Sequence, residues 1–150
     1  MPLDDKSWRL LQALQADARA PLKVLAQATG LSVPATQERL RRLEEAGVVT
    51  GYSATVNAHA AGYGVRAMVG INVPQPGKQA FLAHLAAQHR VLECHHVSGN
   101  DSYLMLVVAT DLPDLERFLA DINAWGETRT SIIFSTPIER RALRNLSSEL

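Results

Sequence analysis

Apolar residues in the first thirty positions recur at the three- and four-residue intervals of amphipathic helices. The first predicted helix begins at a capping aspartate, and its apolar stripe consists of Trp8, Leu10, Leu11 and Leu14. Either Asp4 or Asp5 can supply the cap. The second predicted helix spans about 22–29, with Pro21 suited to its first turn. Its predicted buried positions are Leu22, Leu25, Ala26 and Ala28.

A turn containing glycine separates the second predicted helix from a longer third one. Gly30 supplies the left-handed residue that ends a helix, and Ser32 caps a helix that reaches Ala46. Thr36, Leu40 and Leu43 follow one another on a single face of this helix. A short helix, a turn and a longer capped helix make the helix-turn-helix arrangement, whose second helix enters a DNA major groove.

The outward face of residues 33–46 carries side chains suited to DNA. Gln37 and Arg41 lie one turn apart, and amide and guanidinium groups read adenine and guanine edges. Arg39 and Arg42 lie to the sides of this face, where phosphates run. The predicted DNA-contacting residues are Ser32, Pro34, Gln37, Glu38, Arg39, Arg41 and Arg42. The alternative is a solvated helix of mixed charge, because matches to this pattern include many false positives.

The pattern changes after Gly47. Two β-rich segments, 48–52 and 53–57, predict a wing or a linker strand, and irregular residues 59–64 mark a boundary. From Val65 to Val73 apolar residues alternate with others, which is typical of a strand with one covered face. A helix is predicted next, over 78–89, with Phe81, Leu82, Leu85 and Ala86 buried, and it is followed by strands over 91–98 and 103–110. A second helix follows Asp111 and reaches Ile122, with Leu115, Phe118 and Leu119 buried. The last predicted elements are a strand over 129–135 and a basic helical tail over 138–146.

This order predicts an α+β protein with two folded parts. Three helices form a winged helix-turn-helix, and the β-α-β-β-α-β order that follows is that of the ferredoxin-like sandwich. The predicted domains are 1–52 for DNA binding, 53–64 as a linker strand, and 65–150 as a ferredoxin-like domain for oligomerisation. Because residues 104–109 are apolar on both faces of their strand, we expect a second copy to cover the open face, making a homodimer.

Composition limits the class of protein without identifying the function. Fifteen Lys and Arg balance fifteen Asp and Glu, so the net charge does not by itself indicate nucleic acid. The chain has no apolar run long enough to cross a membrane, and acids stand where a signal peptide needs basic and apolar residues, so a cytoplasmic protein without a membrane partner is expected. The single cysteine, Cys94, excludes an internal disulfide and a multi-cysteine metal site, and no cofactor is expected.

Several segments resemble the leucine-responsive/asparagine-responsive (Lrp/AsnC) family of regulators. They are Leu31-Ser32, the run from Glu38 to Val49, Gly51-Tyr52, the run from Glu93 to Gly99, and Thr128-Arg129-Thr130. The resemblance implies a regulator that binds double-stranded DNA, forms dimers through its sheets and assembles further into octamers. It also implies that residues 65–150 are an effector-sensing domain, in which an amino acid binds where dimers meet, beside the hairpin turn.

The resemblance places the effector site on residues that also suit a free amino acid. Gly99 allows close backbone approach, Asn100 and Asp101 can meet an ammonium group, and hydroxyls can meet a carboxylate. The predicted effector residues are Gly99, Asn100, Asp101, Ser102, Tyr103, Thr128 and Thr130. The alternative is a polar turn that needs such residues for its own geometry. Ser102 and Asp101 stand where the family has an acid and, before it, an aromatic residue, Asn123-Ala124 replaces Pro-Gly, and Val33-Pro34 replaces Pro followed by Ser or Thr.

The sequence also allows functions other than transcription regulation. Cys94, His95 and His96 could suggest catalysis or a metal, but successive strand residues point to opposite faces, so they do not form one site. Haem-biosynthesis decarboxylases resemble the same fold, and a tetrapyrrole-processing enzyme stays an alternative. A third possibility is a small-molecule-binding adaptor that does not bind DNA. The capped third helix favours the DNA-binding regulator, without enzymatic activity, over both.

Overall fold

The computed structural model describes residues 3–146 of the chain. These residues form two compact units: the first ends at Thr55 and includes the chain again from Ile138, and the second is Val56–Pro137. The tail from Ile138 thus groups with the N-terminal unit, although the sequence-based division placed it in the C-terminal domain. The functional division into three domains stays a prediction. No helix within residues 3–146 is long and apolar enough to cross a membrane.

Three helices build the first unit: α1 (Asp5–Ala16), α2 (Leu22–Thr29) and α3 (Val33–Glu45). Asp4 caps α1, accepting the Ser7 backbone N–H at 2.8 Å, and Gly30 ends α2 in the left-handed conformation. Pro21 is the N-cap residue of α2, so it precedes the first turn that the sequence predicted for it. The core of this unit consists of Leu10, Leu11, Leu14, Leu25 and Leu43, with Trp8 and Leu40 packed against it.

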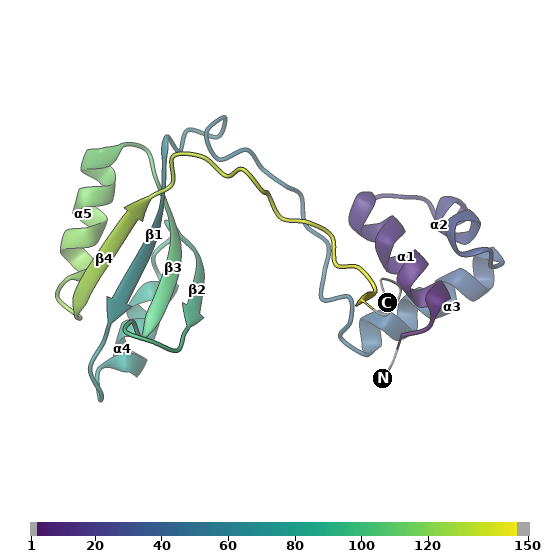
Figure 1. Cartoon of the computed structure of the whole chain (residues 1–150), viewed down its shortest axis with the longest axis horizontal. Helices are drawn as coiled ribbons and strands as arrows, with labels where there is room; N and C mark the ends of the chain where they lie inside the picture. The colour runs from purple at the N-terminus through teal and green to yellow at the C-terminus, as the bar shows by residue number, and fades with distance from the viewer. Residues whose placement is uncertain (1–2, 147–150) are drawn as a thin grey trace. The chain divides into compact units, whose positions relative to one another are not determined.

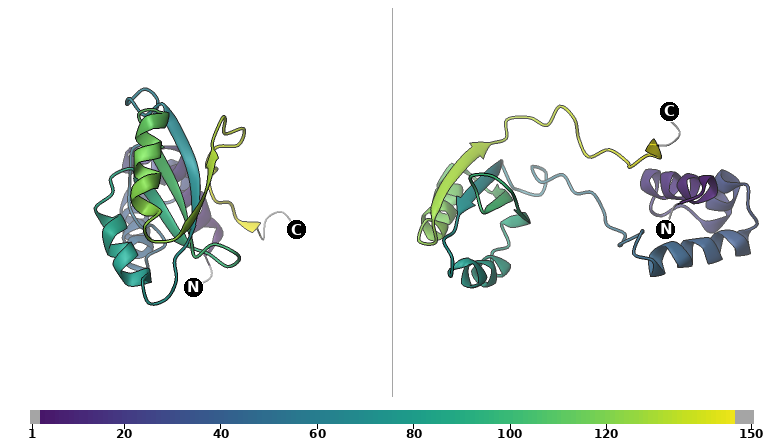
Figure 2. Two further views of the ribbon diagram at one scale, coloured as in Figure 1. Left: turned by 90° about the vertical axis from the view of Figure 1, so that its left-hand side faces the viewer. Right: turned by 60° about the horizontal axis from the view of Figure 1, so that its bottom comes forward.

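The second unit is a four-stranded antiparallel sheet with two helices (Figure 1). Its elements are β1 (Val65–Asn72), α4 (Lys78–Ala86), β2 (Val91–His96), β3 (Tyr103–Ala109), α5 (Leu112–Ile122) and β4 (Glu127–Ile132). The strand order is β2-β3-β1-β4, which confirms the predicted ferredoxin-like fold. Figure 2 shows the two helices and the sheet from two further sides.

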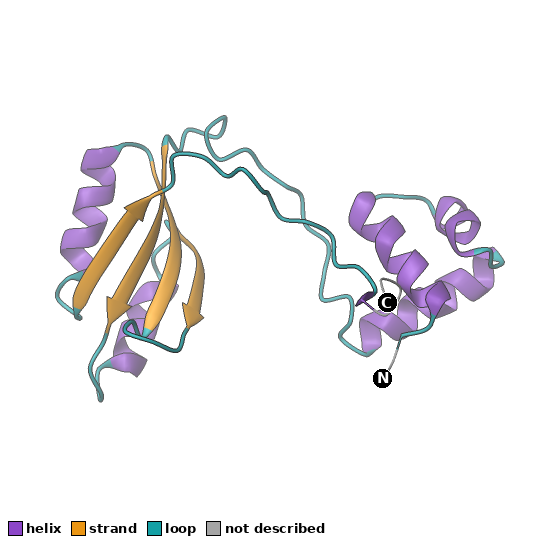
Figure 3. Cartoon of the chain, in the orientation of Figure 1, coloured by secondary structure: helices purple, strands orange, loops and turns teal. Residues whose placement is uncertain are grey.

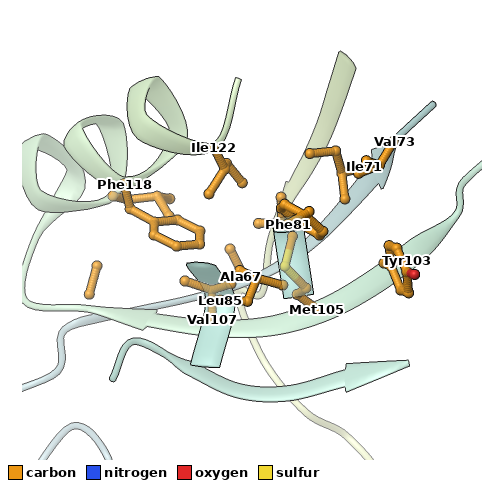
Figure 4. Close-up of a cluster of buried hydrophobic side chains, with 13 residues drawn as sticks. Ala67, Ile71, Val73, Phe81, Leu85, Tyr103, Met105, Val107, Phe118 and Ile122 are labelled. Carbon is orange, nitrogen blue, oxygen red and sulfur yellow. The ribbon is translucent and has the colours of Figure 1, made fainter. Parts of the chain in front are cut away.

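One face of the sheet packs on both helices and forms the core (Figure 4). Alternate residues of β1 and β3 point into it, as the period-two pattern predicted, and meet Phe81 of α4 and Phe118 of α5. The core residues are Ala67, Val69, Ile71, Val73, Phe81, Leu85, Tyr103, Met105, Val107, Ala109, Leu115, Phe118 and Ile122. On the opposite, open face, Met68, Leu104 and Leu106 are half-buried and Val108 is buried.

Asp114 fastens the start of α5 to the sheet. Its side chain is buried, accepts two hydrogen bonds from Arg90 and one from the Thr110 backbone N–H, and is also contacted by Arg117. These donors, with Arg90 the most important, hold the pKa of the Asp114 carboxyl far below its usual range. The carboxylate is therefore charged at neutral pH and links α5 to the segments before β2 and after β3.

Some predicted helix positions are wrong. Ala28 is exposed and Leu22 half-buried, because α2 presents Leu25, Ala26 and Thr29 to the core instead. Helix α4 ends at Ala86 rather than at residue 89, since the N–H groups of residues 87 and 88 bond three residues back and tighten the last turn. The prediction that α4 buries Leu82 and Ala86 is also wrong, because both are exposed and line a shallow groove beside the edge strand β2.

Two of the predicted strands have different ends. Strand β2 ends at His96 because its partner β3 begins opposite it, at Tyr103. Strand β4 runs from Glu127 to Ile132 instead of 129–135. The Ile133 N–H still donates to the Arg66 carbonyl, but β1 begins at Val65, so no partner strand extends farther.

Two further predictions of regular structure are wrong within residues 3–146. The β-rich segments at 48–57 contain no strand (Figure 3), because the N–H groups of Val48 and Val49 both donate to the Leu43 carbonyl and finish α3. The predicted basic helix over 138–146 is not helical over most of its length. Its Leu143 backbone N–H donates to the Gln15 side chain at 2.8 Å and is not available for a helical hydrogen bond.

Candidate DNA-binding and effector sites

Helix α3 is positioned on α2 by two buried threonines and by its own cap. The Ser32 hydroxyl accepts the Ala35 N–H at 3.3 Å, so Ser32 acts as the helix cap. The hydroxyls of Thr29 and Thr36 lie 3.5 Å apart at the crossing of the two helices. Pro34 is exposed in the first turn, where its missing N–H costs no helical hydrogen bond.

Arg39 holds α3 against α1. Its Nη1 donates to Asp4 Oδ1 at 2.6 Å and to Ser7 Oγ at 2.7 Å. Hydrogen bonds from Ser7 and then from Arg39 lower the pKa of the Asp4 carboxyl to about 2. Arg39 is therefore occupied within the first unit, whereas the sequence placed it beside the phosphates.

Arg41 and Arg42 lie on the exposed side of α3 and share Glu38. Arg41 donates to both oxygens of Glu38, at 2.8 and 3.0 Å, and to Glu45, and Arg42 donates to Glu38 at 2.9 Å. These bonds lower the pKa of Glu38 to about 2 and raise that of Arg41 above its usual value. Such exposed pairs are weak and exchange readily, so a DNA base or phosphate can replace a carboxylate.

Gln37 is exposed on the same helix, and no hydrogen bond of its side chain is recorded within the described chain. Its amide is therefore free to form a bidentate pair with adenine. Helix α3 holds three arginines and three glutamates, so its formal charge is zero. It suits the recognition of bases better than the bulk neutralisation of phosphates.

The predicted effector residues divide between the two faces of the sheet. Gly99 and Asn100 are exposed in the hairpin turn, with Gly99 at a positive φ of 117°. Ser102 is buried, and its hydroxyl donates to Asn72 Oδ1 at 3.0 Å and accepts the Val73 N–H at 3.2 Å. Ser102 thus fastens the turn to the end of β1.

Asp101 lies over Gly70 on the open face. A Cβ atom at residue 70 would lie 2.5 Å from Asp101 Oδ2, so the space that the carboxylate fills exists because residue 70 is glycine. Arg129 lies opposite Gly70 on β4 and donates to Asp101 Oδ1 at 2.5 Å. The sequence predicts the two threonines beside Arg129 as effector residues and does not predict Arg129 itself. Strand alternation could have identified it, because Arg129 must face away from both.

Tyr103, Thr128 and Thr130 belong to the helix-covered side of the sheet. Tyr103 is buried, and its ring lies tilted against that of His96, with ring centres 5.4 Å apart. Thr128 lies opposite Ile71 and donates to Asn123 Oδ1 at 2.6 Å, and Thr130 lies opposite Val69. The structure therefore brings Asp101 together with Gly70 and Arg129, but not with the predicted threonines.

The cysteine and histidines of β2 do not form one site. Cys94 is aligned with Met105 and His95 with Leu104, so they project to opposite faces, as the strand pattern predicted. Burial raises the pKa of the Cys94 thiol, which disfavours the reactive thiolate. Among residues 3–146, no group of three or more His, Cys, Asp or Glu side chains is placed to hold a metal ion.

Comparisons with known families match both units. Residues 3–50 match a winged helix-turn-helix DNA-binding model, and residues 66–143 match the Lrp/AsnC ligand binding domain. The HTH-type transcriptional regulator LrpA of Mycobacterium tuberculosis is 41% identical over 140 residues, covering 89% of this chain and 91% of the relative. The chain belongs to the Lrp/AsnC family of transcriptional regulators.

Other members of the Lrp/AsnC family are also similar over most of the chain. The leucine-responsive regulatory protein of Rhizobium meliloti is 38% identical over 122 residues, covering 79% of this chain and 78% of the relative. The solved structure of the feast or famine regulatory protein from M. tuberculosis complexed with L-methionine is 40% identical, with a TM-score of 0.84, and covers 93% of this chain and 97% of that one. The family and the fold predicted from the sequence are thereby confirmed.

Proposed function

We propose that this protein is a sequence-specific DNA-binding regulator that reads base edges with α3. The proposal is supported by the different surroundings of the polar side chains on this helix. Arg39 points back to Asp4 and Ser7, while Gln37 is free and Arg41 and Arg42 are exposed. Gln37 and Arg41 are assigned to bases, Arg42 and the first-turn residues Ser32 and Pro34 to the phosphate side, and Glu38 to holding the two arginines in place.

The open face of the sheet supports a homodimer. Met68, Leu104 and Leu106 form an apolar strip there that a second copy would cover. A twofold dimer would present two α3 helices to half-sites about ten base pairs apart. Further assembly to octamers belongs to the same proposal, as does action in the cytoplasm.

An amino acid is the proposed effector, and Asp101 its proposed ammonium partner. Support comes from the similar protein that was solved with L-methionine and from the carboxylate beside the hairpin turn. Arg129 already pairs with that carboxylate. An amino acid would therefore compete with Arg129 for Asp101, while its own carboxylate could take the guanidinium that is released.

Selection of bound duplexes from a random pool tests the DNA-binding function. The full chain is expected to enrich an imperfect palindrome with half-sites about ten base pairs apart. Binding without enrichment of any sequence would contradict the proposal.

Thermal unfolding in the presence of each of the twenty amino acids tests the effector. A ligand at one hundred times its dissociation constant stabilises the folded protein by about 2.7 kcal/mol. No shift with any amino acid at millimolar concentration would remove the amino-acid part of the proposal and leave the DNA-binding part standing.

A further inference from the structure

The segment after β4 returns to the helical unit, where the Gln15 side chain holds it. The Gln15 amide of α1 donates to the Leu143 carbonyl at 3.1 Å and accepts the Leu143 N–H at 2.8 Å. A side-chain amide thus pairs with both polar groups of one backbone residue, as a neighbouring strand would. Residues 138–146, here called the tail, consequently belong to the same compact unit as the helix-turn-helix.

The tail carries arginines that remain available. Arg140, Arg141 and Arg144 are exposed, and within the described residues none of them forms a hydrogen bond or ion pair. The tail is held through the backbone of Leu143, whose own side chain is 74% exposed. Its attachment therefore leaves the guanidinium groups free.

The charge of the recognition helix explains why such a tail would be useful. Helix α3 is electrically neutral, because Arg39, Arg41 and Arg42 are matched by three glutamates. Residues 1–55 hold seven basic and six acidic side chains, a net charge of 7 − 6 = +1. The tail over 138–146 adds three arginines and one glutamate, or 3 − 1 = +2, and raises the total to +3.

We propose that the tail is a second DNA-contacting element, whose arginines hold backbone phosphates while α3 reads the bases. The inference rests on the proposed DNA-binding function and adds a surface to it. Guanidinium groups suit this role because they are always charged and bind phosphate oxygens with two donors. Phosphate contacts are indifferent to sequence, so the tail contributes affinity and salt dependence rather than selectivity.

The salt dependence of binding measures this contribution directly. The probe is a duplex of about 30 base pairs of mixed sequence, titrated with the full chain between about 50 and 200 mM salt. Each phosphate neutralised contributes about −0.9 to the slope of log K against log salt concentration. The double variant Arg140→Gln/Arg141→Gln is expected to make the slope shallower by about 1.8. Gln15→Ala, which removes both hydrogen bonds to Leu143 without changing the charge of the tail, is expected to make the slope shallower as well.

A matched control separates specific contact from net charge. Lys78→Gln/Arg117→Gln removes two positive charges from the other unit and is expected to keep the parental slope. If the tail variant has the parental slope, or if the control changes the slope as much as the tail variant does, the inference is overturned. Failure of the proposed function looks different, because the parent chain itself would then select no sequence.

Discussion

Arg39 in the middle of α3 and Asp4 at the start of α1 are joined by a 2.6 Å ion pair that spans 35 residues of sequence. The same carboxylate oxygen accepts the Ser7 N–H and so caps α1. One side chain therefore both starts the first helix and holds the recognition helix. This connects the orientation of α3 to the protonation of Asp4.

Asp4→Asn is expected to destabilise the helical unit by about 1 kcal/mol or less at neutral pH. Asparagine still caps a helix, so the change mainly removes the ion pair, which is worth little because Asp4 is 56% exposed. The folded pKa of Asp4, about 2, lies below the usual value of 3.8, so the contribution of Asp4 to stability is present above pH 3.8 and is lost as the pH falls toward 2. The difference in unfolding free energy between parent and variant should shrink over that interval in urea titrations.

Asp5→Asn is the matched control, because Asp5 is an exposed acid in the first turn of α1 without an ion pair in the described chain. A loss of stability equal to that of Asp4→Asn would show that general charge at the helix start, and not the bond to Arg39, is responsible.

Asp101→Ala is expected to abolish amino-acid binding while oligomer size and basal DNA affinity stay nearly unchanged. Arg129→Gln should weaken binding less than Asp101→Ala does, because it removes the guanidinium that competes for Asp101 together with the proposed partner of the ligand carboxylate. Calorimetry with the amino acid that most raises the unfolding temperature measures both effects. Unchanged affinity in Asp101→Ala would refute the ligand role of Asp101 and favour a purely structural turn.

Gly70→Ala is expected to weaken amino-acid binding through a different cause. The new methyl group would lie 2.5 Å from Asp101 Oδ2, so the carboxylate must move away from the position in which it would meet the ligand ammonium. Calorimetry on this variant checks the geometry independently of charge. Parental affinity would mean that the position of Asp101 over Gly70 is irrelevant to the ligand.

Leu106→Glu is expected to dissociate the proposed dimer. Leu106 lies beside Met68 on the open face, where a carboxylate would be buried against the partner's apolar surface. Light scattering should give a monomeric mass for this variant, and circular dichroism should show that it is folded. Leu112→Glu, on an exposed leucine at the start of α5, should keep the parental mass. Parental mass in both variants would contradict pairing through this face.

The periodic elements were predictable, because burial of one face leaves a direct trace in the sequence. Thr36, Leu40 and Leu43 mark the inner face of α3, and the alternation from Val65 to Val73 marks β1. The caps Ser32 and Asp111 were also correct, since each lies one residue before its helix and accepts a backbone N–H.

Partners that are distant in sequence were not predictable. A helical pattern shows that Arg39 lies beside the outer face, but nothing local indicates that Asp4 approaches it. The tail was predicted to be helical because its own sequence gives no sign of the bond between Leu143 and Gln15, which lie 128 residues apart. The prediction of the effector site was incomplete for the same reason. The alternation of β4 shows that Arg129 faces away from Thr128 and Thr130, but only the sheet register brings Arg129 to Gly70 and Asp101.

The affinity ratio between a selected duplex and a scrambled duplex of equal length measures the reading of base edges by α3. A ratio of about 10³ or more is expected for the parent chain. Arg41→Ala should reduce the difference in binding free energy between the two duplexes by about 1–3 kcal/mol. Arg42→Ala should weaken binding to both duplexes alike and leave the ratio unchanged. A ratio near one for the parent, or an unchanged ratio in Arg41→Ala, would contradict the reading of base edges by α3.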